Sequence, residues 1–295
     1  MPARYNAVMV KLMSHGVCFL LLLFSLSGCG RRQPVGPESR LKGAVEIGRS
    51  VEGRPIECLE LGTGPDSTLI IATIHGNENA GTPLVHELAD RFRRNPNLLA
   101  GRKLLIVPVA NPDGYAADKR FNVNGVDLNR NFPASNRQDN DRYGSALSEP
   151  ESQALKALLD RAKPTRIVSI HQPLVCLDYD GPGEAIARHM GRYCELPVQQ
   201  IGSRPGSLGS HAGVDLGIPI ITMELRRDDE KLPFRDLWRA YGPALAASVV
   251  FPEAVPATFF DSQWLVPVVT AGVLIALSVV AQFVRGRRRR GSTLQ

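Results

Sequence analysis

The sequence predicts an α/β fold in which helices cover both faces of a mixed, mostly parallel sheet. Short apolar runs typical of buried strands alternate along the chain with segments whose apolar residues recur at helical spacing. The clearest pair is the run 68–74, followed by the segment 80–94 with Leu84, Leu88 and Phe92 on one helical face. Such an alternation is typical of a sheet that is covered on both sides. A chain of 295 residues can bury the core of one or two domains.

The individual elements follow from the same patterns. Strands are predicted at 43–47, 55–61, 68–74, 103–109, 166–170 and 218–225. Helices are predicted at 80–94, 149–161, 183–193 and 207–216, and the segment 237–250 closes the domain. Ser148 and Glu151 form a capping-box pattern that would start the second helix. The sequence 111–114 is a turn signal, and the polar segment 134–147 is interpreted as an irregular surface loop.

The N-terminal part of the chain carries a signal for export. Residues 1–28 combine a positively charged start with a short apolar run, which is typical of a secretory signal peptide. The sequence Leu26–Cys29 is similar to the lipobox of bacterial lipoproteins, so Cys29 is the predicted lipidation site. An uncleaved N-terminal membrane anchor is the alternative. Residues 29–42, rich in proline and glycine, would form a tether.

The C-terminal part predicts attachment to a membrane. Residues 264–284 contain no charged side chain, and as a helix they would be about 31 Å long, close to the thickness of a bilayer core. Clustered arginines in the tail 285–295 mark the cytoplasmic side of such a helix. The folded domain, residues 43–252, would then lie on the periplasmic, extracytoplasmic side. Residues 253–263 would link it to the transmembrane helix, for which a buried core helix is the alternative.

The formal net charge of +6 does not describe the folded domain. Five arginines lie after residue 284, Arg4 and Lys11 lie in the signal segment, and neither segment contains an acid. Without these seven positive charges the rest of the chain carries −1. A nearly neutral domain does not indicate a nucleic-acid partner.

The main functional signal is a histidine and a carboxylate that directly follow a predicted strand. His75 and Glu78 are three residues apart at the carboxyl end of that strand, where open α/β sheets place their sites. They can bind one zinc ion, and a catalytic zinc needs a third protein ligand and an open position. His171, at the end of another apolar run, is the candidate third ligand. Glu224, also at a strand end, is the candidate general base.

The surrounding motifs resemble those of the zinc carboxypeptidases of the M14 class, and in particular of their murein peptide amidase branch. The resemblance covers residues 43–250 and implies a zinc carboxypeptidase fold, a bound Zn²⁺ and hydrolysis of a C-terminal peptide or amide bond. The matching segments occur in the family's order: His75-x-x-Glu78, Asn111-Pro112-Asp113-Gly114, Arg120-x-Asn122, Asp127-Leu128-Asn129-Arg130-Asn131-Phe132-Pro133, Ser148-Glu149-Pro150-Glu151, His171-x-Pro173-Leu174-x-Cys176, Pro205-Gly206-Ser207 and Thr222-Met223-Glu224-Leu225.

The resemblance also implies roles for the residues between the metal ligands. Arg120 would stabilise the developing oxyanion, and Asp127 would accept a hydrogen bond from the imidazole of His75. Asn129 and Arg130 would bind the free terminal carboxylate of a peptide, because a guanidinium pairs with a carboxylate through two parallel hydrogen bonds. The branch cleaves the γ-D-glutamyl–diaminopimelate bond, so a murein peptide is the expected substrate.

The chain departs from the family at the lip of the site. Relatives usually carry a tyrosine that closes over the substrate shortly before the Pro-Gly-Ser turn, but the segment 201–207 contains none. Leu208 follows the turn, where relatives selective for basic residues can carry an acid. His211 is expected to be a surface residue.

Three cysteines remain outside the signal segment and the lipobox: Cys58, Cys176 and Cys194. An exported protein can form disulfides, so a Cys176–Cys194 bond and free thiols are both open. Zinc binding by these cysteines is not expected, because no C-x-x-C spacing is present.

Three other activities remain open. The first is a general carboxypeptidase for α-linked peptides. The second is a deacylase of the aspartoacylase kind, which also uses a His-x-x-Glu motif and a distant histidine. The third is a catalytically weak protein that binds murein peptides, suggested by the missing tyrosine. The presence of Glu224 favours catalysis, because binding alone needs no base.

Overall fold

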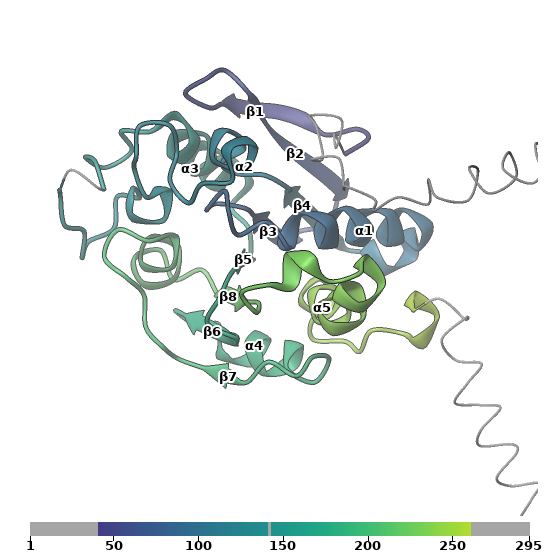
Figure 1. Ribbon diagram of the computed structural model, residues 1–295. Coiled ribbons are helices and arrows are strands. Elements are labelled where there is room, and N and C mark those ends of the chain that lie inside the picture. The colour runs from purple at the N-terminus through teal and green to yellow at the C-terminus, as the bar shows by residue number, and fades with distance from the viewer. Residues whose placement is uncertain (1–40, 141–142, 261–295) are drawn as a thin grey trace, which may run out of the picture. The chain divides into compact units, whose positions relative to one another are not determined.

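An eight-stranded sheet organises residues 41–140 and 143–260, the part of the chain that this computed structural model describes (Figure 1). Across the sheet the strand order is β1-β2-β4-β3-β5-β8-β6-β7. The central strands β4, β3, β5 and β8 are parallel to one another, whereas β1–β2, β2–β4 and β6–β8 are antiparallel pairs. The predicted α/β class with a mixed, mostly parallel sheet is confirmed. The strands are β1 (Val45–Arg49), β2 (Pro55–Gly62), β3 (Asp66–Ala72), β4 (Arg102–Val107), β5 (Arg166–His171), β6 (Cys176–Asp180), β7 (Val198–Gln199) and β8 (Ile220–Glu224).

The central strands are covered on both faces. The run Leu69–Ala72 of β3 is almost completely buried, as are Ile167 and Val168 of β5. Such continuous apolar runs are typical of parallel strands that are buried on both sides. Because β3, β5 and β8 are parallel, their carboxyl ends meet at one edge of the sheet.

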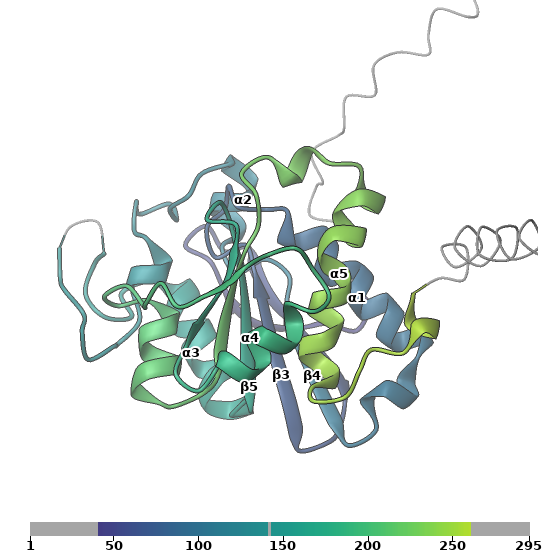
Figure 2. The ribbon, with the colours of Figure 1, turned by 90° about the horizontal axis from the view of Figure 1, so that it is seen from below.

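Helices lie on either side of the sheet (Figure 2). One face packs against α1, α4 and α5, and the other against α3 and the π-helical turn η3. At the start of α1, a Cβ on Gly81 would lie only 2.8 Å from Cγ2 of Ile170, so glycine allows the helix to approach β5 closely. The helices are α1 (Gly81–Arg94), α2 (Pro112–Ala117), α3 (Pro150–Ala162), α4 (Glu184–Met190), η3 (Gly209–Asp215) and α5 (Phe234–Val250), with short 3₁₀ turns η1 (Pro96–Leu99), η2 (Leu128–Arg130), η4 (Asp229–Lys231) and η5 (Ala257–Phe259).

Several local predictions differ from the structure. The expected turn at 111–114 instead starts α2, whose first amide groups are capped when Gly114 N donates to Asn111 Oδ1 at 2.9 Å. The expected capping box at α3 is wrong, because Ser148 donates to the Glu149 carboxylate and Pro150 begins the helix. Strands β6 and β7 were not predicted.

The folded domain extends beyond the predicted limits 43–252 on both sides. Leu41 is 4% exposed and belongs to the main core. Phe259, placed by the sequence in a linker, is 2% exposed, and its ring centroid lies 5.0 Å from that of Phe92. Apolar burial in the main core therefore holds part of the predicted tether and linker in the domain.

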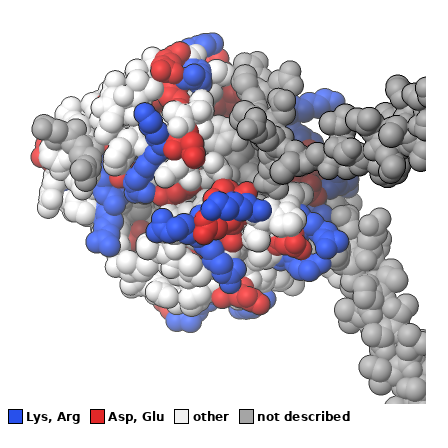
Figure 3. Space-filling view, viewed as in Figure 1, with Lys and Arg blue, Asp and Glu red and all other residues white. Residues whose placement is uncertain are grey.

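The predicted segments for export and membrane attachment, residues 1–28 with Cys29, 264–284 and 285–295, lie outside the described residues. Within the described residues, no helix has the length and apolarity needed to cross a membrane. Cys58, Cys176 and Cys194 are free thiols, so the possible Cys176–Cys194 disulfide is not formed. On the face drawn in Figure 3, basic and acidic side chains are interspersed.

Candidate functional site

A strained turn brings the metal-binding motif to the carboxyl edge of the sheet. After β3, Thr73 adopts a left-handed conformation with φ of 53°, which is uncommon for a residue other than glycine. Its hydroxyl lies 2.8 Å from the hydroxyl of Thr82, and its carbonyl accepts a hydrogen bond of 3.0 Å from Asn111 N. These contacts hold the turn that directs His75 and Glu78 toward the end of β5.

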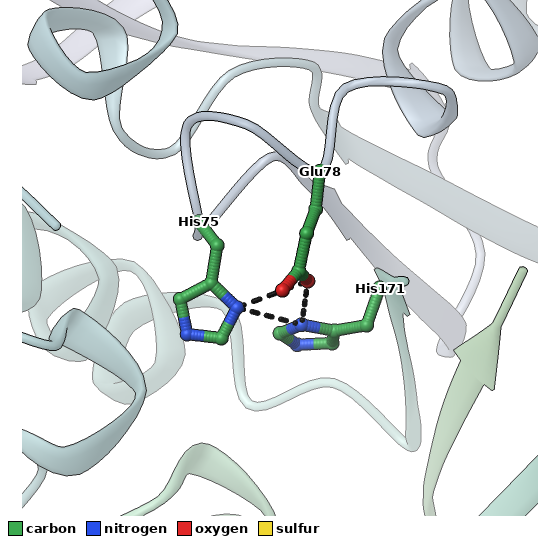
Figure 4. Close-up of side chains that lie close together, drawn as sticks. All are labelled: His75, Glu78 and His171. Carbon is green, nitrogen blue, oxygen red and sulfur yellow. Dashed lines mark hydrogen bonds and ion pairs between the residues drawn. The ribbon is translucent and has the colours of Figure 1, made fainter. Parts of the chain in front are cut away.

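Three ligand atoms converge at this edge, from His75, Glu78 and His171 (Figure 4). Glu78 Oε2 lies 3.0 Å from His75 Nδ1 and 2.9 Å from His171 Nδ1, and the two Nδ1 atoms are 3.2 Å apart. Ligand atoms about 2.0–2.1 Å from a tetrahedral zinc ion lie about 3.3 Å from one another. All three side chains are buried. Two imidazole nitrogens and one carboxylate oxygen at these distances provide the spacing and the donor chemistry that zinc requires.

The opposite ring nitrogens of both histidines are already occupied. His75 Nε2 lies 2.9 Å from Asp127 Oδ1, as predicted, and His171 Nε2 lies 3.0 Å from Ser169 Oγ. Such outer partners fix the ring orientation and leave the other nitrogen for the metal. The role of Ser169 was not predicted, although its position two residues before His171 on β5 places both side chains on the same face.

The electrostatics of the site favour ionised carboxylates. Burial would raise the pKa of Glu78, but hydrogen bonds with His171 and His75 lower it below its ordinary value. The pKa of Asp127 is also lowered, because the hydrogen bond with His75 and the charge of Arg120 outweigh burial. Burial would lower the pKa of His75, but its hydrogen bonds with Asp127 and Glu78 raise it. Protons therefore compete with a metal ion for this histidine as the pH falls.

Glu224 is placed beside the ligands by the sheet itself. It is the last residue of β8, and its partner in the register with β5 is His171. The side chain is 8% exposed, and its Oε2 accepts a hydrogen bond of 3.2 Å from Leu174 N. Burial raises the pKa of Glu224, which brings it closer to the value suited to a general base.

Arg120 also lies at the site. Its Nη1 is 2.5 Å from Glu78 Oε1 and its Nη2 is 3.3 Å from Asp127 Oδ2. The side chain is 37% exposed, so the guanidinium connects a metal ligand with the partner of His75 and still reaches solvent. Its role toward an oxyanion stays a prediction.

The predicted carboxylate-binding pair lies on the 3₁₀ turn η2. Asp127 Oδ1 accepts a hydrogen bond of 3.0 Å from Asn129 N and so caps this turn. Asn129 Oδ1 accepts from Leu208 N at 2.9 Å, and its Nδ2 has no hydrogen-bond partner among the described residues. Arg130 Nη1 donates to Asn129 O at 2.5 Å, and Arg130 forms no ion pair with a described carboxylate. Both side chains therefore keep donors for a ligand.

Glu149 supports this loop, although no role was predicted for it. Its carboxylate accepts hydrogen bonds from Asn122 Nδ2 at 2.6 Å, from Asn124 Nδ2 at 2.8 Å and from Ser148 Oγ at 2.8 Å. Its backbone N donates to Asn131 Oδ1 at 3.2 Å. The motifs that contain these residues were recognised, but nothing in their spacing shows that one carboxylate joins them.

The expectation for His211 is wrong. Its side chain is 5% exposed and stacks on Phe132, with ring centroids 6.3 Å apart and an angle of 14° between the planes. The turn η3 packs into the core beneath α3 through Leu208 and Ala212, and it carries His211 inside with it. The short sequence Gly209–Gly213 around this histidine contains too few apolar residues to predict its burial.

Comparison with known families identifies a match. The family model for zinc carboxypeptidases matches residues 38–187, a range that contains every predicted metal-binding, substrate-binding and catalytic residue except Glu224. The chain is 36% identical over 203 residues to murein peptide amidase A of Escherichia coli (strain K12), covering 62% of this chain and 81% of that protein. It is 30% identical over 201 residues to murein peptide amidase A of Vibrio campbellii, covering 61% of this chain and 78% of that protein.

Solved structures show the same likeness. The crystal structure of a murein-tripeptide amidase from Escherichia coli O157 matches with a TM-score of 0.57 and 29% identity, over 76% of this chain and 98% of that one. A bovine thrombin-activatable fibrinolysis inhibitor matches with a TM-score of 0.59 and 23% identity, over 70% of this chain and 87% of that one, which supports the fold alone.

Proposed function

This chain belongs to the zinc carboxypeptidase family and is a hydrolase of that family, and from this premise we propose that it cleaves the γ-D-glutamyl–diaminopimelate bond of murein peptides. The observation that carries the proposal is the convergence of His75, Glu78 and His171 beside the buried Glu224. The relatives with the names murein peptide amidase and murein-tripeptide amidase support the choice of substrate.

The residues present suit the hydrolysis of an amide bond. His75, Glu78 and His171 would hold a zinc ion, which would supply a Lewis acid that lowers the pKa of water and polarises a carbonyl. Glu224 takes a proton from the attacking water and can pass it to the leaving nitrogen. Arg120, partly exposed beside Glu78, donates to the oxygen that gains negative charge as the carbonyl is attacked.

Substrate recognition rests on the free carboxylate of the leaving residue. Arg130 can offer a planar pair of donors to it, and Asn129 adds its side-chain amide. Leu208, which follows the Pro-Gly-Ser turn, is apolar and 1% exposed, so this position offers no charge to a basic leaving residue. These features favour a murein peptide over a polypeptide that ends in lysine or arginine.

The test compares three substrates with the purified chain. We expect release of diaminopimelate from a free murein tripeptide, much slower release when the terminal carboxylate is amidated, and slow cleavage of ordinary α-linked peptides. Faster hydrolysis of α-linked peptides than of the murein tripeptide would instead identify a general carboxypeptidase. Absence of hydrolysis with zinc bound would favour a murein-peptide binding protein.

We also propose that the domain is exported and attached to a membrane, with the C-terminal tail in the cytoplasm. The uncharged segment 264–284, the arginines that follow it and the signal pattern around Cys29 support this location. Protease added to spheroplasts should digest the domain but not a tag placed after Gln295. A protected domain with an exposed tag would reverse the orientation.

A further inference from the structure

We propose that Arg137 is a positioning residue that fixes Arg130 in the orientation needed to bind the substrate carboxylate. This inference rests on the proposed function, because it assumes that Arg130 binds that carboxylate. Arg137 belongs to the segment 134–147, which the sequence presents only as an irregular polar loop. In the structure its side chain is 9% exposed and contacts the backbone of Arg130 directly.

The guanidinium of Arg137 joins three parts of the chain. Its Nη1 donates to Arg130 O at 2.6 Å, and its Nη2 donates to Gly144 O. Its Nε lies 2.7 Å from Asp139 Oδ1. A planar guanidinium can donate to the two carbonyl groups at once and still pair with a carboxylate, whereas a lysine ammonium is a single point charge. Arg137 thus connects the backbone of Arg130 with Gly144, which lies farther along the same loop.

The Pro-Gly-Ser turn packs on the same peptide. Gly206 has φ of +69°, and a Cβ there would lie 2.4 Å from Arg130 O and 3.3 Å from Arg137 Nη1. Gly206 N donates to Asn136 Oδ1 at 3.2 Å, and Phe132 N donates to Gly206 O at 3.0 Å. Only a residue without a side chain allows this approach, so the turn, Arg130 and Arg137 form one packed unit.

These backbone contacts are important because the side chain of Arg130 makes few contacts that would hold its guanidinium in place. Its one hydrogen bond within the described residues goes to Asn129 O, and it has no carboxylate partner there. Bidentate hydrogen bonding to a carboxylate requires the guanidinium to be held within about 0.5 Å and about 10–20° of the productive geometry. Loss of Arg137 should therefore loosen the binding of a substrate carboxylate while leaving the metal ligands in place.

The experiment measures kcat and KM of the full chain on the free murein tripeptide and on its amidated form. In Arg137→Gln we expect KM for the free tripeptide to rise about tenfold with kcat within about twofold, and the slow reaction of the amide to stay unchanged. Arg137→Lys should lie between Arg137→Gln and the parent, because it restores the charge without the fork. Zinc content should equal that of the parent in every variant.

Two further variants keep the test decisive. Asp139→Asn removes an exposed partner and leaves Arg137 in place, so it should fold and raise KM for the free tripeptide about twofold. As a control, Arg188→Gln breaks an exposed ion pair with Glu184 and should leave kcat and KM unchanged for both substrates. If Arg137→Gln and Asp139→Asn keep the parental preference for the free carboxylate, or if both substrates lose rate equally, the proposal is wrong. A parent without that preference would contradict the proposed function, and this inference with it.

Discussion

The metal ligands and the residues proposed to bind substrate are held in place by different means. His171 and Glu224 are the last residues of two neighbouring strands, and the register of β5 and β8 sets them side by side. His75 and Glu78 follow a third strand of the same sheet. Backbone pairing within a buried sheet therefore positions His171 and Glu224 directly, and the turn after β3 brings His75 and Glu78 to the same edge.

By contrast, the substrate-binding pair sits on irregular chain that side chains hold in place. Before η2, the side chain of Asn122 donates a hydrogen bond to Glu149. At the end of η2, Arg137 donates a hydrogen bond to the carbonyl of Arg130. The 3₁₀ turn η2, which carries Asn129 and Arg130, is not part of the sheet. Single side-chain changes in this loop should therefore affect substrate binding without loss of the metal, because the metal ligands lie on β5 and on the turn after β3.

The largest effect on turnover is expected for Glu224, the proposed general base at the end of β8. Glu224→Gln keeps the shape of the side chain and the acceptor for Leu174 N, so zinc and the fold should be retained. Loss of the base should lower kcat by about 10²–10⁴-fold. Turnover on the murein tripeptide and zinc content by elemental analysis would check this. Turnover at the parental rate would show that another group acts as base.

An intermediate effect is expected in the loop. Glu149→Gln replaces a buried carboxylate that receives three hydrogen bonds with an amide that cannot accept all of them. We expect the free energy of unfolding to fall by about 1–3 kcal/mol and KM to rise, with the zinc content unchanged. Denaturant unfolding would measure the first effect, and the exposed Glu195→Gln is the matched control. Loss of zinc in Glu149→Gln would mean that the loop also holds the metal centre.

The smallest effect concerns Asp180, which lies at the end of β6. Burial and the nearby charge of Asp178 raise the pKa of Asp180 to about 6. A carboxyl whose pKa is raised on folding favours the folded state below its unfolded pKa, and this contribution is lost as the pH rises through about 6. Asp180→Asn should therefore be more stable than the parent at pH 7, by at most about 3 kcal/mol, and most of this difference should be lost near pH 4.

Thermal unfolding of the parent and Asp180→Asn across this pH range would measure the difference. The exposed Asp160→Asn is the matched control. An equal difference at pH 4 and pH 7 would mean that Asp180 acts through its hydrogen bonds rather than its charge.

The sequence predicted the parts of the site that follow from strand ends. His75 and His171 each come after an apolar run, and periodicity locates such runs well. Strand β6 was missed because Asp178 and Asp180 interrupt its apolar character, although both are buried. Arg137 was missed for a different reason, since its role lies in hydrogen bonds to the carbonyl groups of Arg130 and Gly144, which no apolar periodicity records.

Hydrolysis by this chain should depend on a zinc ion held by His75, Glu78 and His171. The most direct test removes the metal with a chelator, returns zinc in measured amounts and follows release of diaminopimelate from the murein tripeptide. We predict that activity disappears with the metal, returns fully at about one zinc ion per chain and cannot be restored in His75→Ala/His171→Ala. Full zinc binding by that double variant, or undiminished activity in the stripped parent, would contradict the account.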